Sequence, residues 1–191
     1  CIRDRLAAVK NKVLIMDLDA QGNASTGLGV PKDEREKSTY DLLTGKASLK
    51  DVVKKTNIPS LFIAPASTDL SSIDVDLFEE QGRVVKLRNL LEKESFDFDY
   101  ILIDCPPSLN LLTINSMAAS NSVLVPLQAE FFALEGLSQL LLTVRDIRSK
   151  INQDLKIHGI VLTMFDKRNN LSEQIVEDVR LSLIHISEPT R

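Results

Sequence analysis

Two acidic residues follow an apolar run near the start of the chain, and a third follows a similar run in its middle. Asp17 and Asp19 end the sequence VLIMDLD, and Asp104 ends YILID, directly before Cys105 and two prolines. Carboxylates at strand ends can hold a magnesium ion through water, beside the phosphates of a nucleotide. The same acids could instead cap the turn or helix that follows each strand. For the isolated D-x-P-P pattern at Asp104, the two interpretations weigh about equally.

Short apolar runs recur along the chain and predict the strands that carry these acids. They are rich in Val, Ile and Leu and lack strict alternation with polar residues, as expected for strands buried on both faces. The predicted strands are Val13–Met16, Leu61–Ala64, Tyr100–Ile103, Val123–Leu127 and Gly159–Met164.

Longer amphipathic stretches lie between the predicted strands. Leu77–Lys93 and Leu134–Ile151 carry apolar residues at helical spacing, whereas Gly27–Lys37 contains a proline and many charges and predicts a surface loop. Strands that alternate with helices predict an α/β fold with a mainly parallel sheet. Ligands of such folds bind beyond the carboxyl ends of the strands, where all three aspartates fall.

The composition is that of a globular chain with one domain. The 191 residues are 43% hydrophobic and 26% charged, and the net charge of −4 argues against a protein that is basic over its whole surface. No apolar run approaches the roughly 20 residues that span a bilayer. Two cysteines form no disulfide framework, which favours a reducing cytoplasm. We expect Cys105 to be a buried small residue, because no basic neighbour activates it as a nucleophile.

Both ends of the sequence suggest a piece of a longer protein. The chain starts with Cys1, and its last residues, Leu181–Arg191, break the preceding helical pattern with the sequence LSLIHISEPTR. This tail is similar to the translation of a transposon-type sequencing adapter. We therefore expect a partial domain over residues 1–180 and a non-native tail over residues 181–191.

Four segments together resemble the ParA/Soj family of chromosome and plasmid partitioning ATPases, a branch of the deviant Walker P-loop group. They are VLIMDLDAQGN, DCPPSL, VPLQAEFFALEGLSQLL and GIVLTMFDKRNNLS, and they occur in the family's order. The resemblance implies a three-layer α/β fold of the P-loop NTPase type that binds ATP and Mg²⁺. It also implies an ATP-dependent homodimer, non-specific DNA and a ParB-like protein as partners, no stable membrane insertion, and a bacterial cytoplasmic location on the nucleoid.

The same resemblance assigns roles to individual residues by their place in the motifs. Asp19 matches the aspartate that positions the attacking water, Asp17 the aspartate beside the phosphates and magnesium, and Asp104 the Walker B aspartate that serves the metal. Gln21 begins the turn after the first acids. The residues that match the nucleotide and dimer surface are Glu130, Phe131 and Phe132, and those that match the adenine pocket are Thr163, Met164, Phe165 and Asp166.

One part of the family pattern does not occur in this sequence. The K-G-G-x-G-K-T/S loop, whose amides and lysines hold the phosphates, has no match, and the opening CIRDRLAAVKNK resembles only the end of the helix that follows it. The later segment GNASTGLG lacks a lysine followed by serine or threonine. We therefore expect an ATPase in the intact parent and an inactive chain when residues 1–191 stand alone.

Several basic residues allow two interpretations. They follow or close the second predicted helix and are Arg145, Arg148, Lys150, Lys167 and Arg168. Cations are favoured at the carboxyl end of a helix and often form a solvated face. Alternatively, they form part of the non-specific DNA surface that the resemblance implies, because lysine and arginine contact phosphates.

Other functions stay open on the sequence alone. A MinD-like ATPase, which positions the division machinery at the membrane, is one alternative, and a non-catalytic DNA-binding regulator that has lost its nucleotide site is another. The aspartates at the first strand could also be the ribose-binding acids of a dinucleotide fold, although the D-x-P-P strand does not fit that hypothesis.

Overall fold

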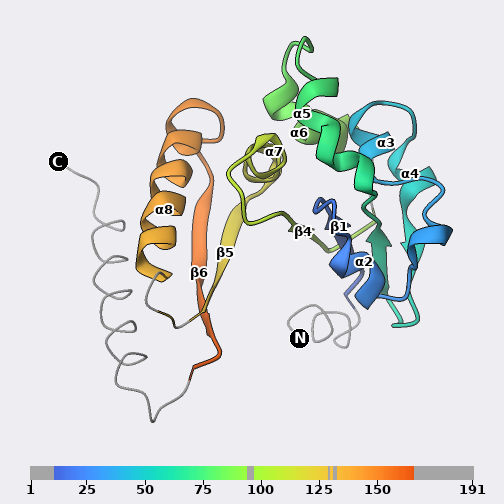
Figure 1. Cartoon of the computed structure of the whole chain (residues 1–191), viewed down its shortest axis with the longest axis horizontal. Coiled ribbons are helices and arrows are strands. Elements are labelled where there is room, and N and C mark those ends of the chain that lie inside the picture. The colour runs from blue at the N-terminus through green and yellow to red at the C-terminus, as the bar shows by residue number, and fades with distance from the viewer. Residues whose placement is uncertain (1–10, 94–96, 129, 131–132, 166–191) are drawn as a thin grey trace. The chain divides into compact units, whose positions relative to one another are not determined.

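The computed structural model describes residues 11–93, 97–128, 130 and 133–165. The chain divides into two compact units, Cys1–Ala119 and Ser120–Arg191, which are described separately below (Figure 1). Each unit contains a parallel pair of strands, so the predicted α/β class with mainly parallel strands is confirmed. None of the described helices is both long enough and apolar enough to cross a bilayer.

The first unit contains a four-stranded sheet in the order β2-β3-β1-β4. The strands are β1 (Val13–Asp17), β2 (Lys54–Lys55), β3 (Leu61–Ala64) and β4 (Tyr100–Asp104). β1 pairs in parallel with both β3 and β4, and only the short β2 runs antiparallel to its neighbour. Every residue of β1 is buried, as its uninterrupted apolar sequence predicts for a central strand.

Both faces of β1 are covered by apolar side chains. Leu14 and Met16 belong to one core cluster, whereas Val13 and Ile15 belong to a second, because successive side chains of a strand point to opposite faces. The first cluster includes residues of the helices α3 (Thr39–Leu43), α4 (Leu49–Val52), α5 (Ile73–Asp76), α6 (Lys86–Lys93) and α7 (Leu111–Ala119). The second includes Leu28, which follows the short helix α2 (Asn23–Gly27).

The predicted helix Leu77–Lys93 is wrong over its first half. Leu77 follows α5, and α6 begins only at Lys86, after the 3₁₀ turn η3 (Arg83–Val85). Gly82, whose φ of 78° is left-handed, is the N-cap of η3, so a right-handed helix cannot run unbroken from Leu77 to Lys86. Two further 3₁₀ turns occur in this unit, η1 (Lys32–Glu34) and η2 (Thr68–Ser72), so the predicted loop over residues 27–37 contains η1.

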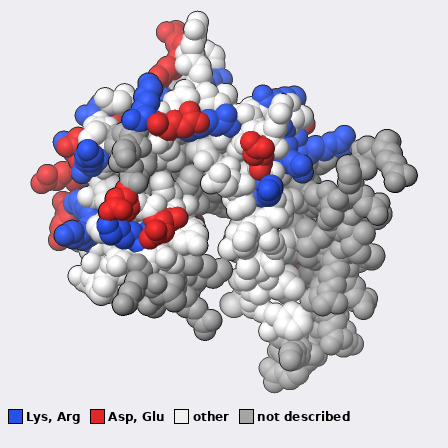
Figure 2. Space-filling model, turned by 180° about the vertical axis from the view of Figure 1, so that it is seen from behind, with Lys and Arg blue, Asp and Glu red and all other residues white. Residues whose placement is uncertain are grey.

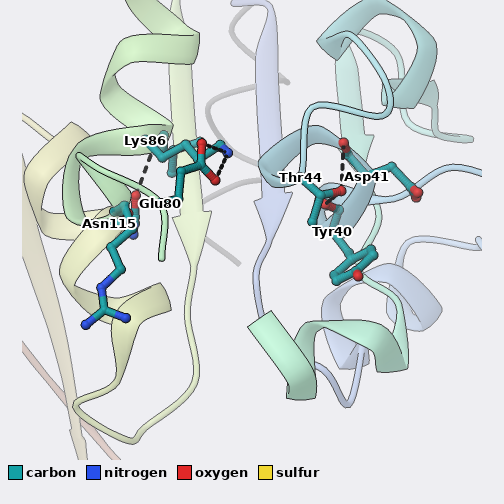
Figure 3. A network of polar contacts seen from close by, with 8 residues as sticks. Tyr40, Asp41, Thr44, Glu80, Lys86 and Asn115 are labelled. Carbon is teal, nitrogen blue, oxygen red and sulfur yellow. Dashed lines mark hydrogen bonds and ion pairs between the residues drawn. The ribbon is translucent and has the colours of Figure 1, made fainter. Parts of the chain in front are cut away.

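Polar contacts at helix ends stabilise the helical side of the first unit (Figure 3). Thr44 Oγ1, just past α3, donates to the Tyr40 carbonyl oxygen at 2.9 Å. The buried Asn115 side chain accepts from the Leu87 N–H at 3.1 Å, which satisfies a donor in the first turn of α6 that no helix carbonyl can reach. Lys86 pairs with Glu80 beside it.

The second unit contains β5 (Ser122–Gln128), α8 (Ala133–Lys150) and β6 (Lys156–Thr163). β5 and β6 are parallel, and α8 connects them, as in a βαβ unit. Val125 and Leu127 on β5 form an apolar cluster with Leu137 of α8. The predicted helix over residues 134–151 is thus confirmed within one residue at each end, whereas β6 begins three residues before the predicted Gly159.

Candidate functional site

The carboxyl ends of β1 and β4 lie side by side. In the parallel pairing, Asp17 is the register partner of Asp104, and the Leu18 N–H donates to the Asp104 carbonyl oxygen at 2.8 Å. The structure therefore brings together acids that are 87 residues apart in sequence (104 − 17). This is the arrangement expected at the ligand-binding edge of an α/β sheet.

Asp17 is the buried acid of this edge. Its side chain is 0% exposed, and both carboxylate oxygens accept hydrogen bonds. Oδ1 accepts from the Asp19 N–H at 3.1 Å, and Oδ2 accepts from the Ser25 N–H at 2.8 Å and from Ser25 Oγ at 2.6 Å. A buried carboxylate is stable only when such donors replace water. Asp17 thus fastens the loop that follows β1 to the end of the strand.

Asp19 lies half-buried in the turn that Asp17 supports. Its Oδ1 accepts from the Gln21 N–H at 3.0 Å, and its carbonyl oxygen accepts from the Gly22 N–H at 2.8 Å. The first of these bonds is an Asx turn, a local contact that fixes the direction of an aspartate side chain. No described residue donates to Oδ2 in the hydrogen bonds of this turn, so one carboxylate oxygen stays available to a ligand or water.

Asp104 is exposed at the end of β4, next to the half-buried Cys105. Burial raises the pKa of the Cys105 thiol above its ordinary value, and the negative charges of Asp104 and Asp19 raise it further. The thiol is therefore protonated at neutral pH, which agrees with the expectation that Cys105 is no nucleophile. The contributions of both carboxylates to this pKa shift indicate that Asp19 and Asp104 lie near the same thiol.

Asp104 has the donor chemistry that Mg²⁺ prefers. Carboxylate oxygens suit this hard cation, and proteins commonly bind it through only one or two carboxylates, with waters and substrate phosphates completing the shell. Within the described part of the chain, no group of three His, Cys, Asp or Glu side chains gathers to hold a metal alone. A single strand-end carboxylate therefore fits a magnesium ion shared with water and a phosphate ligand.

The residues predicted to line an adenine pocket fall in the second unit. Thr163 ends β6 opposite Gln128 of β5, and its Oγ1 donates to the Leu127 carbonyl oxygen at 3.3 Å. Met164 follows with a φ of 56° and an 81% exposed side chain. A left-handed conformation costs free energy for a residue with a side chain and often marks functional loops. Asp166 lies outside the described residues.

Glu130 is the described member of the three residues predicted for the nucleotide and dimer surface. Glu130 is exposed, and its carboxylate accepts from Gln128 Nε2 at 2.7 Å. Phe131 and Phe132 lie outside the described residues.

The predicted basic residues on α8 are exposed. Arg145, Arg148 and Lys150 lie on its solvent side, whereas Val144 and Ile147 are buried against the unit. Lysines and arginines mix with acidic side chains over the face that Figure 2 displays, and Lys167 and Arg168 lie outside the described residues. The exposure of the α8 cations agrees with both a solvated helix face and a phosphate-binding surface.

The sequence motifs did not single out three residues that shape the loop after β1. Ser25 and Thr39 are fully buried, and Thr39 Oγ1 donates to the Asp17 carbonyl oxygen at 2.7 Å. Arg35, in a run of charged residues, turns back to the same loop. The serine lies eight residues and the arginine eighteen residues from Asp17, so only the folded chain reveals their contacts.

Comparison with known proteins identifies the chain's relatives. A family model described as an AAA domain matches residues 2–157. The chain is 49% identical over 177 residues to the chromosome partitioning protein ParA of Caulobacter vibrioides, covering 92% of this chain and 66% of that protein. It is 46% identical over 175 residues to the sporulation initiation inhibitor protein Soj of Bacillus subtilis, covering 92% and 69%.

Among solved structures, the chain resembles a cobyrinic acid a,c-diamide synthase from Mycobacterium smegmatis with bound ADP and magnesium. The TM-score is 0.88 at 35% identity, over 94% of this chain and 73% of that one. The chain spans about two thirds of the length of the two partitioning proteins.

Proposed function

Because this chain belongs to the ParA/Soj family of partitioning ATPases and matches an AAA domain model over residues 2–157, we propose that it forms part of an enzyme that uses ATP hydrolysis to partition chromosomes or plasmids. In this proposal the end of β1 and β4 is the acidic side of a magnesium–ATP site. The observation that carries it is the pairing of Asp17 with Asp104, which brings the Asp19 turn and an exposed strand-end carboxylate to one edge.

Each acid has a separate role in this proposal. Asp104, exposed at the strand end, holds Mg²⁺ directly or through water, and Asp19 orients the water that attacks the terminal phosphate. Asp17 is buried, and both of its carboxylate oxygens already accept hydrogen bonds from the chain. A role in supporting the turn is therefore favoured over direct contact with phosphate. Bound ATP supplies the phosphoryl group, and the magnesium ion neutralises charge on its phosphates.

The remaining residues of the site are assigned by family position. Gln21 begins the turn that approaches the ligand or a second subunit, and Thr163, Met164 and Asp166 line the adenine pocket. The phosphate-binding lysines and amides are supplied by the K-G-G-x-G-K-T/S loop of the complete protein. The bound nucleotide and magnesium in the M. smegmatis relative support this assignment of cofactors.

The partners and location follow from the same family membership. We infer an ATP-dependent homodimer that binds DNA without sequence preference, moves a ParB-like protein bound to its cargo, and resides in the bacterial cytoplasm on the nucleoid. The exposed Arg145, Arg148 and Lys150 of α8, together with Lys167 and Arg168, provide cations for the DNA phosphates.

The roles of the acids can be separated in a full-length protein that contains this chain. Asp19→Ala should leave ATP binding and dimerisation within about twofold of the parent and cut hydrolysis at least about tenfold, because it removes only water positioning. Asp104→Ala should weaken magnesium-dependent ATP binding as well. Steady-state hydrolysis and equilibrium binding with and without Mg²⁺ measure both effects.

Asp33→Ala is the matched control, because Asp33 is an exposed aspartate of the same unit in η1. It should behave as the parent in both assays. An Asp19→Ala variant that hydrolyses ATP at the parental rate would remove Asp19 from the proposed mechanism.

A further inference from the structure

Arg35 lies half-buried just after η1 and makes hydrogen bonds to four other residues. Its Nε and Nη2 donate to the Val30 carbonyl oxygen at 3.1 and 2.9 Å. Nη2 also lies 3.2 Å from the Gly22 carbonyl oxygen and 2.8 Å from Thr26 Oγ1. Nη1 donates to the Ala66 carbonyl oxygen at 3.2 Å.

These partners lie in two stretches of chain, residues 22–30 and residue 66. Gly22 closes the Asp19 turn, Thr26 and Val30 lie in and after α2, and Ala66 lies two residues past β3. A guanidinium carries five N–H donors in a planar arrangement, so one side chain can bridge several carbonyl groups at once. Within the described residues, the partners of Arg35 are carbonyl and hydroxyl oxygens and include no carboxylate.

A second link reaches Ala66 from the buried side of the same loop. Ser25 Oγ donates to Asp17 Oδ2 at 2.6 Å and accepts from the Ala66 N–H at 3.0 Å. Both polar groups of the Ala66 backbone are therefore bonded to this loop, the N–H through Ser25 and the carbonyl oxygen through Arg35. The loop after β1 is fixed at two points to the segment after β3.

The close approach of Arg35 to Gly22 shows how tightly the guanidinium fits against the turn. A Cβ atom built on Gly22 would lie 2.1 Å from Arg35 Nη1, and Gly22 has a φ of 63°. The turn that directs Asp19 is thus shaped on one side by the Asx contact and on the other by the guanidinium.

We propose that Arg35 is a positioning residue for Asp19: by bridging Gly22, Thr26, Val30 and Ala66 it holds the turn in which Asp19 aims the attacking water. This inference rests on the proposed ATPase function. Phosphoryl transfer depends on the placement of groups around the reacting phosphate, and a displacement of about 1 Å can cost about a hundredfold in rate. Arg35 makes no hydrogen bond to Asp19 or Asp104, so its removal acts on rate through the turn.

The test compares Arg35→Met and Arg35→Lys in the full-length protein that contains this chain. Methionine keeps an unbranched apolar stem without donors, and lysine keeps the charge without the planar donor set. Lys32→Met is the matched control, because Lys32 is an exposed cation of the neighbouring turn η1. The measurements are kcat for ATP hydrolysis, the equilibrium Kd for ATP with Mg²⁺, and amide hydrogen exchange over residues 19–30 and 66.

We expect Arg35→Met to lower kcat about tenfold or more, with the Kd for ATP changed less than about twofold. The kcat of Arg35→Lys should lie between those of Arg35→Met and the parent. Lys32→Met should match the parent in both kcat and Kd. Exchange at Gly22 and Ala66 should accelerate only in the Arg35 variants. Equal loss of kcat and affinity, or an unchanged kcat, would overturn the positioning role. A lysine variant with parental kcat would show that charge alone suffices and would overturn the bridging geometry.

Failure of the ATPase proposal gives a different result. In that case the parent itself hydrolyses no ATP, and the exchange measurement still decides whether Arg35 holds the turn. Unchanged exchange over residues 19–30 and at Ala66 in Arg35→Met would overturn the inference regardless of activity.

Discussion

Three aspartates at one end of a sheet differ in burial and in hydrogen bonding, and these differences suit them to different roles. Asp17 is fully buried and bonded through both oxygens, Asp19 is half-buried in an Asx turn, and Asp104 is exposed. The sequence predicted their position at the strand ends from the apolar runs before them. It could not predict their different burial, because that depends on Ser25 and Thr39, which reach Asp17 only after the loop has folded back.

Three glycines allow the cost of a left-handed backbone to be compared with the cost of a steric clash. They are Gly22, Gly45 and Gly27. Gly22 has a φ of 63° and no room for a Cβ beside Arg35, Gly45 has a φ of 75° in open space, and Gly27 has neither constraint. A left-handed residue with a side chain costs about 1–2 kcal/mol. Alanine should therefore destabilise a full-length protein most at Gly22, by about 1–2 kcal/mol at Gly45, and least or not at all at Gly27.

Urea unfolding midpoints of the three alanine variants test this order. Gly27→Ala serves as the control, because alanine in a helix is favourable by up to about 1 kcal/mol relative to glycine. Equal midpoints for the variants at positions 22 and 45 would mean that Arg35 moves aside without cost and contributes nothing to the turn.

At the scale of elements, the sequence predicted the central strands better than the short helices. The run Leu61–Ala64 was predicted with its observed bounds, since a buried strand needs only a continuous apolar segment. Helices of four or five residues, such as α3 and α4, span little more than one turn and give no repeated apolar period. Each of these two begins with a serine whose side chain forms a capping box, Ser38 with Asp41 and Ser48 with Asp51.

The sequence of β4 is apolar throughout its first four residues, as is typical of a strand in the interior of a sheet. Among the described strands, however, β4 pairs only with β1. Its residues Ile101, Leu102 and Ile103 are half-buried and Tyr100 is 47% exposed, whereas all of β1 is buried. An uninterrupted apolar strand normally has neighbours on both edges. We predict that the coding sequence directly upstream of Cys1 continues in frame and encodes a strand followed by K-G-G-x-G-K-T/S within roughly 30 residues, the length of one strand–loop–helix unit.

Sequencing the DNA upstream of the Cys1 codon checks this prediction. A complete upstream reading frame without the phosphate-binding motif would contradict both the prediction and the ATPase proposal. Finding the motif would also argue against a regulator whose nucleotide site is lost.

At the scale of the whole molecule, family membership depended on several motifs in a fixed order. The four segments that resemble ParA/Soj proteins lie in both units, and the matches to the Caulobacter and Bacillus proteins each cover 92% of the chain. Composition contributed little, because a net charge of −4 is compatible with many functions. The role of the α8 cations could not be predicted from sequence or decided by exposure, since solvated and DNA-binding faces look alike without a ligand.

One edge of β4 pairs with no strand among the described residues, and this also predicts how residues 1–191 behave when expressed alone. An interior strand without its neighbour presents unpaired N–H and C=O groups, and each such buried group costs about 1–3 kcal/mol. Domain stability is only about 5–15 kcal/mol, so a few such losses remove most of it, and an exposed edge also pairs with other chains. We expect this chain to aggregate or to lack cooperative unfolding, and to hydrolyse no ATP with Mg²⁺.

Size-exclusion chromatography, urea unfolding and an ATPase assay test this expectation. The control is the same chain extended upstream through the phosphate-binding motif, which should be monodisperse and active. A monodisperse, cooperatively unfolding 191-residue chain would refute the structural expectation, and ATP turnover that Asp104→Ala abolishes would refute the functional one.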